Sequence, residues 1–508
     1  MSEISPTVHL DMEKGPNDAN DLSETSGSGE TISSPTRSST KRDQSSDIVT
    51  WDGDDDPENP MNWSTGKKWL TVALISILTL VTPLGSSMFA PGIPRIMAEF
   101  NETSSLMATF VVSIYVLGFA FGPLVVAPLS EIHGRAPLYN WGNVLFVLFT
   151  VGTALSQNMA MLLAFRFLMG LAGSVPITIG SGSIADIMPI ESRGKAMSAW
   201  ALGPLLGPCI GPLAGGYLIE AAGWRWVYWL VTILGGVFIP GSFLFIKETY
   251  GPVILEKKAR RIRKETGNMS KRTEESGQTI GQRFKVAIIR PLKLLFITPI
   301  VSLMALYMAV SYGILYLLIA TFSFVYKDNY NFGEGQAGLT FLPAGIGMMI
   351  GVVTFGALSD VLVQKRQKKG LEHRPEVRLN PSLTIPCGVA LPAGLFLYGW
   401  TAQYAVHFIV PMLGVAIFSC GLMGVMMCVQ NYLLDTYPRY AASVTAALAV
   451  LRSFAAAFLP LAGLDMYDAL GLGWGNSLLG FICVAMVPIP FVLYTFGERL
   501  RKRFDPKL

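Results

Sequence analysis

Twelve apolar segments, each long enough to cross a lipid bilayer, follow one another between residues 69 and 496. A hydrocarbon core of about 30 Å takes roughly 17–25 apolar residues in a helix. Inside it, helices satisfy their own backbone hydrogen bonds. Only 15% of the residues are charged, against about 25% in a soluble protein. We therefore expect an all-α membrane protein with spans at 69–89, 106–128, 138–156, 161–184, 196–219, 226–246, 296–320, 337–359, 380–402, 407–430, 441–465 and 474–496.

A long basic connection, 247–293, separates the first six segments from the last six, and each group carries related signals. Leu-Ser-Glu131 follows the second segment, and Leu-Ser-Asp360 follows the eighth. Asp186 and Asp435, each three residues before a proline, close the fourth and tenth segments. Such parallel repeats predict two pseudo-symmetric six-helix bundles. The expected domains are a disordered tail at 1–66, bundles at 67–246 and 296–496, a basic linker at 247–295 and a tail at 497–508.

The distribution of positive charge predicts the orientation. The even-numbered connections hold 23 Lys and Arg residues, whereas the odd-numbered ones hold only Arg95, Arg225 and Lys327. Because cytoplasmic loops carry the excess of Lys and Arg, we expect both termini in the cytoplasm. The N-terminal tail has 14 acidic and 6 basic residues through Lys68. Its polar composition predicts disorder and lacks the apolar core of a secretory signal.

The fifth segment contains an unusual run of glycine and proline between Ala201 and Leu218. In water, Pro costs about 3 kcal/mol and Gly about 1 kcal/mol inside a helix. For fifteen positions after Trp200, however, the run has no polar residue, which argues against a loop, and packed membrane helices tolerate both Gly and Pro. Two adjacent helical stripes then form a surface for close helix packing: Gly203, Gly207, Gly211 and Gly215 beside Pro204, Pro208 and Pro212.

Arg166 and Arg452 lie inside apolar segments, where a charge costs roughly 2.5–3.5 kcal/mol. Each either serves a substrate or proton pathway or pairs with protein groups to hold helices together. No Asp or Glu lies near the middle of a segment, so the sequence singles out no proton-exchanging carboxylate. Further polar candidates for a cavity are Ser86, Tyr312, Gln430 and Asn431, and candidates for gating at helix ends are Glu131, Gly134, Arg135, Asp186 and Asp435.

Three motifs resemble signatures of the major facilitator superfamily. APLSEIHGRAPLY (127–139) resembles the signature between the second and third helices, although Ala127, Glu131, Ile132 and Ala136 depart from the common form. RFLMGLAGS (166–174) resembles the fourth-helix signature, with Met169 where Gln is common. The Gly/Pro run resembles the fifth-helix signature of proton-coupled antiporters. With PENPMNWSTGKKW (57–69), SSMFAPGIP (86–94) and NYLLDTYPRYAASVTAALAVLRS (431–453), the chain looks like a fungal twelve-helix drug:proton antiporter.

The resemblance implies a plasma-membrane exporter of small amphipathic molecules, such as drugs or secondary metabolites, that works as a monomer by alternating access and proton exchange. A polyamine or organic-acid exporter, a facilitative nutrient importer and a non-transporting receptor remain alternatives. No P-loop, HExxH or nucleophile–base pattern occurs, so we expect neither an enzyme, a metal site nor a cofactor. A net charge of +4 gives no argument for nucleic acid. Asn101 is the glycosylation sequon on an expected outward connection.

Overall fold

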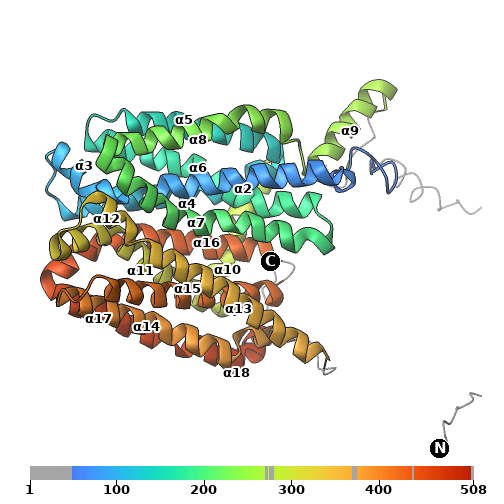
Figure 1. Cartoon of the computed structure of the whole chain (residues 1–508). Coiled ribbons are helices and arrows are strands. Elements are labelled where there is room, and N and C mark those ends of the chain that lie inside the picture. The colour runs from blue at the N-terminus through green and yellow to red at the C-terminus, as the bar shows by residue number, and fades with distance from the viewer. Residues whose placement is uncertain (1–47, 269–272, 274–279, 369–373, 438–439, 505–508) are drawn as a thin grey trace, which may run out of the picture. The chain divides into compact units, whose positions relative to one another are not determined.

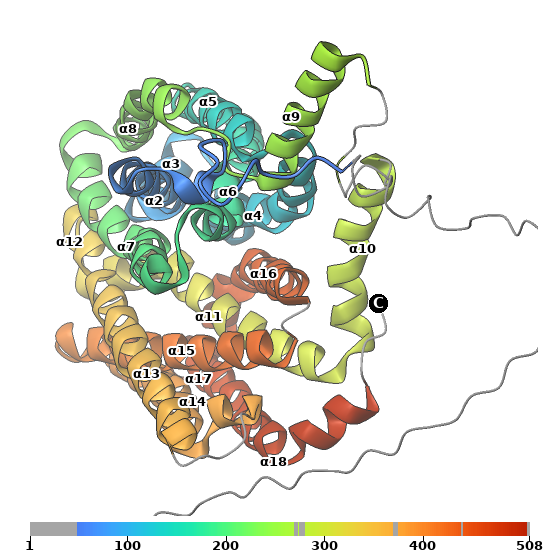
Figure 2. The ribbon, with the colours of Figure 1, turned by 90° about the vertical axis from the view of Figure 1, so that its right-hand side faces the viewer.

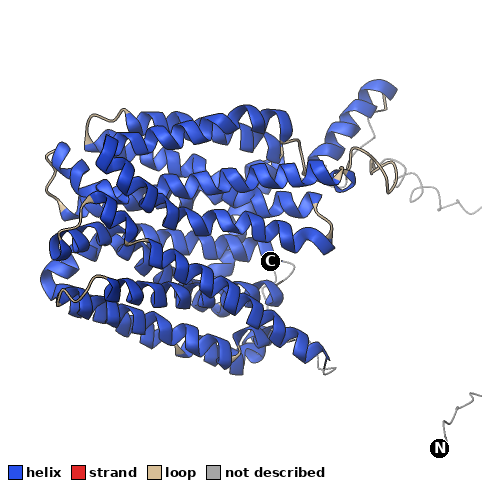
Figure 3. Cartoon of the chain, in the orientation of Figure 1, coloured by secondary structure: helices blue, strands red, loops and turns tan. Residues whose placement is uncertain are grey.

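The computed structural model describes residues 48–268, 273, 280–368, 374–437 and 440–504, and these residues form helices joined by short loops (Figure 3). Ten helical stretches of this part are long and apolar enough to cross a membrane. One of them, 443–503, has 61 residues and contains three successive helices. The expected all-α membrane architecture is confirmed.

Six long helices and their short extensions form the first half. Each of the first six expected segments falls on one of them, and the Gly/Pro run lies within one continuous helix. The elements are α2 (Thr65–Ser87) with η2 (Ala90–Gly92) and α3 (Ile93–Glu99), α4 (Ser105–His133), α5 (Arg135–Ala154), α6 (Met159–Ile187), α7 (Ile190–Ala222) and α8 (Trp224–Phe245).

The second half repeats this arrangement, with several helices broken into consecutive pieces. The expected segment 441–465 is divided where α16 ends and a short 3-10 turn begins. The elements are α11 (Pro299–Tyr330), α12 (Glu334–Leu339), α13 (Leu342–Lys368), η3 (Pro375–Leu379), α14 (Pro381–Gln403), α15 (Ile409–Thr436), α16 (Ala441–Phe458), η5 (Leu459–Ala462), α17 (Gly463–Met486) and α18 (Pro488–Arg503). Figures 1 and 2 show α2–α8 grouped apart from α11–α18.

Large apolar side chains remain exposed along the outer helices of both halves. Val237 and Leu244 of α8 are each 66% exposed, and Trp474 and Phe481 of α17 are 58% and 56% exposed. An apolar surface of this extent would be unstable in water and suits a lipid environment. The long helices and this surface together describe a multi-pass membrane protein.

The linker between the halves contains two amphipathic helices, α9 (Gly251–Thr266) and α10 (Ile280–Ile297). Figure 2 shows α10 running from the first half to the second, and it packs against α4 and α16. We call the end of the helices that carries α9 and α10 the linker end, and the other the opposite end. Residues 1–47 of the expected disordered tail lie outside the described residues.

Residues 48–64, which also belong to the expected tail, pack against α9 instead. Lys258 of α9 is 4% exposed, and its Nζ lies 3.0 Å from Asp56 Oδ2 and 2.8 Å from Asp52 Oδ2. Arg261, one turn later, pairs with Glu58 at 2.9 Å. The acidic residues before the first helix therefore neutralise one face of the basic linker helix.

Candidate functional site

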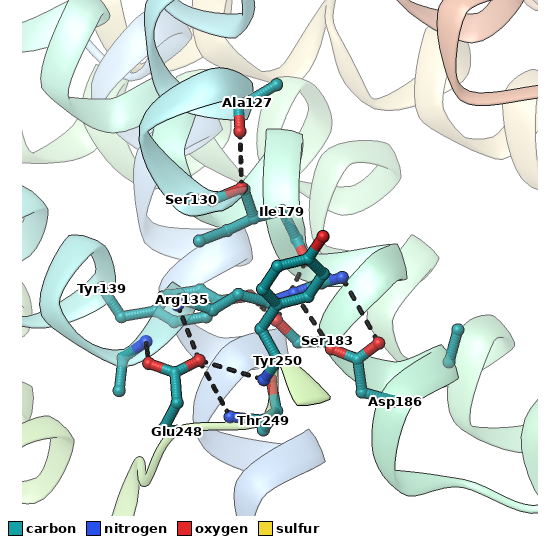
Figure 4. A network of polar contacts seen from close by, with 12 residues as sticks. Ala127, Ser130, Arg135, Tyr139, Ile179, Ser183, Asp186, Glu248, Thr249 and Tyr250 are labelled. Carbon is teal, nitrogen blue, oxygen red and sulfur yellow. Dashed lines mark hydrogen bonds and ion pairs between the residues drawn. The ribbon is translucent and has the colours of Figure 1, made fainter. Parts of the chain in front are cut away.

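A network of charged side chains joins four segments of the first half at its linker end (Figure 4). Arg135, at the start of α5, forms an ion pair with Asp186 near the end of α6, with 3.0 Å between Nε and Oδ2. Its Nη2 donates to Asp186 Oδ1 at 3.3 Å, and its Nη1 donates to the Ile179 carbonyl at 3.2 Å. The sequence-predicted residues Arg135 and Asp186 therefore meet, and they tie α5 to α6.

Glu248, in the segment after α8, binds the turn between α4 and α5. Its carboxylate accepts from the backbone N–H of Arg135 at 2.9 Å and of Ala136 at 3.4 Å. Gly134 forms that turn with φ 93° and ψ 171°, a conformation that is essentially restricted to glycine. A Cβ atom at Gly134 would overlap the Glu248 carboxylate. Glycine is thus required at position 134 both for the positive-φ backbone conformation and for the close approach of Glu248. The predicted gating residue Glu131 is exposed in the last turn of α4.

The second half carries a matching ion pair. Arg378 of η3 lies 3.0 Å from Asp435 of α15, measured from Nε to Oδ2. Its Nη1 also donates to Ser359 Oγ at 3.1 Å. The predicted repeat partners Asp186 and Asp435 thus each form an ion pair with an arginine of their own half.

The glycine stripe of α7 and a second face of the same helix pack on different neighbours. The glycine stripe packs on α2: Cβ atoms at Gly203 and Gly211 would lie 2.9 Å from Leu80 N and Ser87 Oγ, and those at Gly207 and Gly215 would overlap Pro83 and Met88. Another face of α7 meets α12 and α13 of the second half, where Cys209 fits against Gly345 and the Pro212 carbonyl against Gly338. The stripe thus allows close packing inside the first half, and its neighbouring face packs across the boundary between the halves.

Arg166 is completely buried and fully engaged by the protein. Its Nε donates to the Val111 carbonyl at 2.6 Å, its Nη1 to Tyr228 Oη at 2.9 Å and its Nη2 to the Ser86 carbonyl at 3.3 Å. The guanidinium also lies 3.7 Å from the centre of the Phe89 ring. These contacts join α2, α4, α6 and α8.

Arg452 has a different environment. It is half-buried in α16, and its Cζ lies 4.7 Å from the centre of the Tyr312 ring on α11. Tyr312 in turn lies 5.2 Å, between ring centres, from Tyr316. The hydroxyl of Ser86 is buried and has no hydrogen-bond partner among the described residues. Gln430 and Asn431 are half-buried neighbours near the linker end of α15.

Two hydrogen bonds of the described residues join the halves at the opposite end. The Ser105 hydroxyl, at the start of α4, donates to Asp465 of α17. Ser323 Oγ of α11 donates to the Ala90 carbonyl of η2 at 3.0 Å. Asn101 is exposed in the loop between α3 and α4, with φ 54°.

Sequence reasoning missed Glu248, Arg378 and Lys258 as organising residues. The repeat does not single out Arg378, because the offset of 249 between Asp186 and Asp435 carries Arg135 to Thr384. Glu248 and Lys258 offered no pattern either, because their partners are 113 and 202 residues away. Among the described residues, no group of three or more His, Cys, Asp or Glu side chains is arranged to hold a metal ion.

Comparisons with known proteins agree with this architecture. A family model described as Major Facilitator Superfamily matches residues 75–460. The chain is 50% identical to Efflux pump radE of Floropilus chiversii over 91% of this chain and 86% of the relative. It is 47% identical to MFS-type transporter penM of Penicillium rubens over 97% of this chain and 94% of the relative.

Solved structures show the same fold. The partially occluded inward-open xylose transporter XylE from E. coli aligns with a TM-score of 0.61 at 17% identity, over 85% of this chain and 98% of that one. An inward-facing bacterial homologue of the lysosomal transporter Spinster aligns with a TM-score of 0.59 at 14% identity, over 87% and 99%. The relatives are named as transporters and efflux pumps, and this chain belongs to the major facilitator superfamily.

Proposed function

We propose that the chain is a proton-coupled exporter of small amphipathic organic molecules, either drugs or fungal secondary metabolites. Support for export comes from relatives at 47–50% identity, one of which is named an efflux pump. Support for proton coupling comes from the Gly/Pro run of α7, which resembles the antiporter signature. One inward proton supplies about 2.3 kcal/mol per 100 mV of membrane potential, which suffices to sustain a cargo gradient.

The positions of the polar contacts between and within the halves support an alternating-access mechanism. Ser105 and Asp465, and Ser323 and Ala90, join the halves at the opposite end. The ion pairs of Arg135 and Arg378 at the linker end instead lie within their own halves. This pattern supports an alternating-access cycle in which the present conformation is closed at the opposite end. By the positive-inside rule we assign the linker end, and with it both termini, to the cytoplasm.

In this cycle the two halves rock about the cargo. Each charged network keeps the linker end of its half rigid, so we assign Gly134, Arg135, Asp186 and Asp435, together with Glu131 in the same turn region, to gating. The close packing of α7 on α2 keeps the first half intact as it moves. We further propose that the protein acts as a monomer in the plasma membrane. The residues that we assign to the cargo pathway are Arg452, Tyr312, Ser86, Gln430 and Asn431. Arg166 supports this pathway structurally.

The direction of transport tests this proposal. Yeast cells that express the protein are loaded with a fluorescent amphipathic dye and compared with cells that carry Arg135→Gln, which removes the ion pair to Asp186. Export predicts lower dye accumulation with the wild type than with an empty vector, and a smaller difference with the variant. Higher accumulation with the wild type would instead identify an importer.

A further inference from the structure

Arg166 and Arg452 both lie within the helical halves, yet their guanidinium groups are satisfied to very different degrees. A guanidinium has five N–H donors, and Arg166 directs all three of its nitrogens to protein oxygens. Arg452 donates no hydrogen bond and makes no ion pair among the described residues, and its Nε is buried without a partner. Its guanidinium instead makes a cation–π contact with the face of the Tyr312 ring. The protein thus leaves a charged, multidentate donor available.

No described carboxylate near Arg452 supplies the missing counter-charge. The helices packed on α16 carry acidic groups only toward their ends: Glu131 in the last turn of α4, Asp328 in the last turn of α11, and Asp435 in the last turn of α15, which pairs with Arg378. The helix α10 carries no acidic residue, and its charged residues, among them Arg290 and Lys293, are basic. Arg452 lies eleven residues after Ala441, or about 16 Å along the helix.

Arg452 also lies where the two halves meet. Phe454, two residues later, packs edge-to-face on Phe121 of α4, with 5.4 Å between ring centres. The guanidinium lies over the Tyr312 ring of α11, and the buried Tyr316 ring lies next to Tyr312. A cation, two phenol rings and a boundary between moving halves are therefore brought together at one place. A bound anion would offset the cost of an arginine at this depth.

We propose that Arg452 is the counter-charge for an anionic cargo, and that the site takes aromatic molecules bearing an ionised carboxylate or phenolate. The guanidinium donates two parallel hydrogen bonds to the oxyanion, a geometry that suits carboxylates. Tyr312 and Tyr316 pack against the aromatic ring of the cargo. This inference rests on the proposed transport function and narrows its cargo from amphipathic molecules in general to aromatic oxyanions.

The test uses purified protein in liposomes and a panel of aromatic carboxylates, each paired with its uncharged amide; 2-naphthoate and 2-naphthamide form one pair. Wild type, Arg452→Gln and Arg452→Lys are compared for uptake into the vesicles. Arg290→Gln is the matched control, since Arg290 also contacts an aromatic ring, that of Tyr440 at 5.9 Å, but lies in α10. We expect the wild type and the control to favour the acids. Arg452→Gln should reduce acid flux by roughly tenfold or more, the value of one charged hydrogen bond, and reduce amide flux much less, so that the acid preference is lost. Arg452→Lys should retain part of the preference.

Three other outcomes are distinguishable. Equal flux of acid and amide in the wild type, or an unchanged acid preference in Arg452→Gln, would overturn the inference while leaving the exporter intact. Loss of both acid and amide flux in Arg452→Gln would assign Arg452 a structural role and also overturn it. If the wild type moved no member of the panel, the inference would be overturned, and the exporter function would fail with it only if the yeast cells also showed no dye export.

Discussion

Gly207 of α7 and Pro83 of α2 approach so closely that a Cβ atom on Gly207 would overlap the Cβ atom of Pro83. The same helices come together again one turn further on, where Ser87 Oγ of α2 donates to the Gly207 carbonyl at 3.3 Å. Glycine at this position therefore removes the steric barrier and leaves a carbonyl accessible to a hydroxyl from the neighbouring helix. A residue that is unfavourable for an isolated helix becomes favourable for a packed pair of helices.

Gly207→Leu should separate α7 from α2 and strongly reduce transport. Overpacking of a tight interface typically costs about 1–3 kcal/mol, and here the obstacle includes proline ring atoms that cannot rotate away. Gly236→Leu is the matched control, because a Cβ atom at Gly236 of α8 meets no atom within 4 Å. Thermal unfolding and dye export are measured for both variants. Wild-type stability of Gly207→Leu would contradict the packing described here.

A comparison of Gly134→Ala with Gly223→Ala separates the stability cost of backbone strain from the cost of displacing Glu248. Both glycines link consecutive helices with nearly the same conformation, φ 93° and ψ 171° against φ 90° and ψ 162°. Each alanine should cost about 1–3 kcal/mol through backbone strain. Only Gly134→Ala must also displace Glu248, because a Cβ atom at Gly223 has no neighbour within 4 Å. The midpoint of thermal unfolding should therefore fall further for Gly134→Ala, and equal shifts would contradict a role for Glu248.

The contact between residues 48–64 and α9 should be stable at neutral pH and open in acid. Backbone N–H groups of Asp52 and Glu58 donate to the Asp56 carboxylate, and with Lys258 they lower the pKa of Asp56 to about 2. Because this pKa is lower in the folded state than in the unfolded one, its stabilising contribution is fully present above about pH 4 and is lost as the pH falls toward 2. Protection of the backbone amides at 48–64, measured as the exchange rate relative to an unstructured chain at the same pH, should be high at pH 5 and largely lost near pH 2.

Asp56→Asn should produce the same opening at pH 7, since it removes the buried one of the two carboxylates that face Lys258. Asp55→Asn is the control, because Asp55 is exposed beside it. Limited proteolysis at pH 7 should cleave the segment before α2 faster in Asp56→Asn than in Asp55→Asn. Identical cleavage rates would show that this carboxylate does not hold the segment.

Glycosylation of Asn101 reports the orientation of the chain. Asn101 is exposed in the loop between α3 and α4 and belongs to the sequon Asn-Glu-Thr. The proposed orientation exposes this loop to the secretory lumen, so endoglycosidase treatment should increase the gel mobility of the wild type. Asn101→Gln should remove the shift, whereas Asn268→Gln, in a second sequon beside α9, should leave it unchanged. A shift that depends on Asn268 would contradict the orientation.

The lengths of the apolar segments predicted the architecture well because the bilayer imposes a length on each spanning helix. The repeated motifs added the division into two halves. Each apolar segment needs a fixed length to satisfy its backbone in lipid, so its residues reveal it without knowledge of its neighbours. The pairing of Arg135 with Asp186 was accessible for the same reason, since both residues stand at predicted helix ends on the same side.

Contacts that depend on side-chain direction were not accessible from the sequence. Arg166 and Arg452 look alike as isolated charges in apolar segments, yet one donates to three protein oxygens and the other rests on a tyrosine ring. The difference depends on which backbone carbonyls neighbouring helices present. Residues 48–64 have a disordered composition, and their order comes from Lys258, about 200 positions away. Neither the surroundings of the two arginines nor the pairing of residues 48–64 with Lys258 produces a recognisable pattern in the local sequence.

Substrate-driven proton movement tests the central claim most directly. Inside-out vesicles with an acidified lumen are given an aromatic carboxylate from the outside, and luminal pH and cargo uptake are recorded together. Proton-coupled export predicts that cargo enters the lumen as protons leave, so the luminal pH rises only when the cargo is present. Cargo uptake with no change in luminal pH would contradict antiport and identify a facilitator.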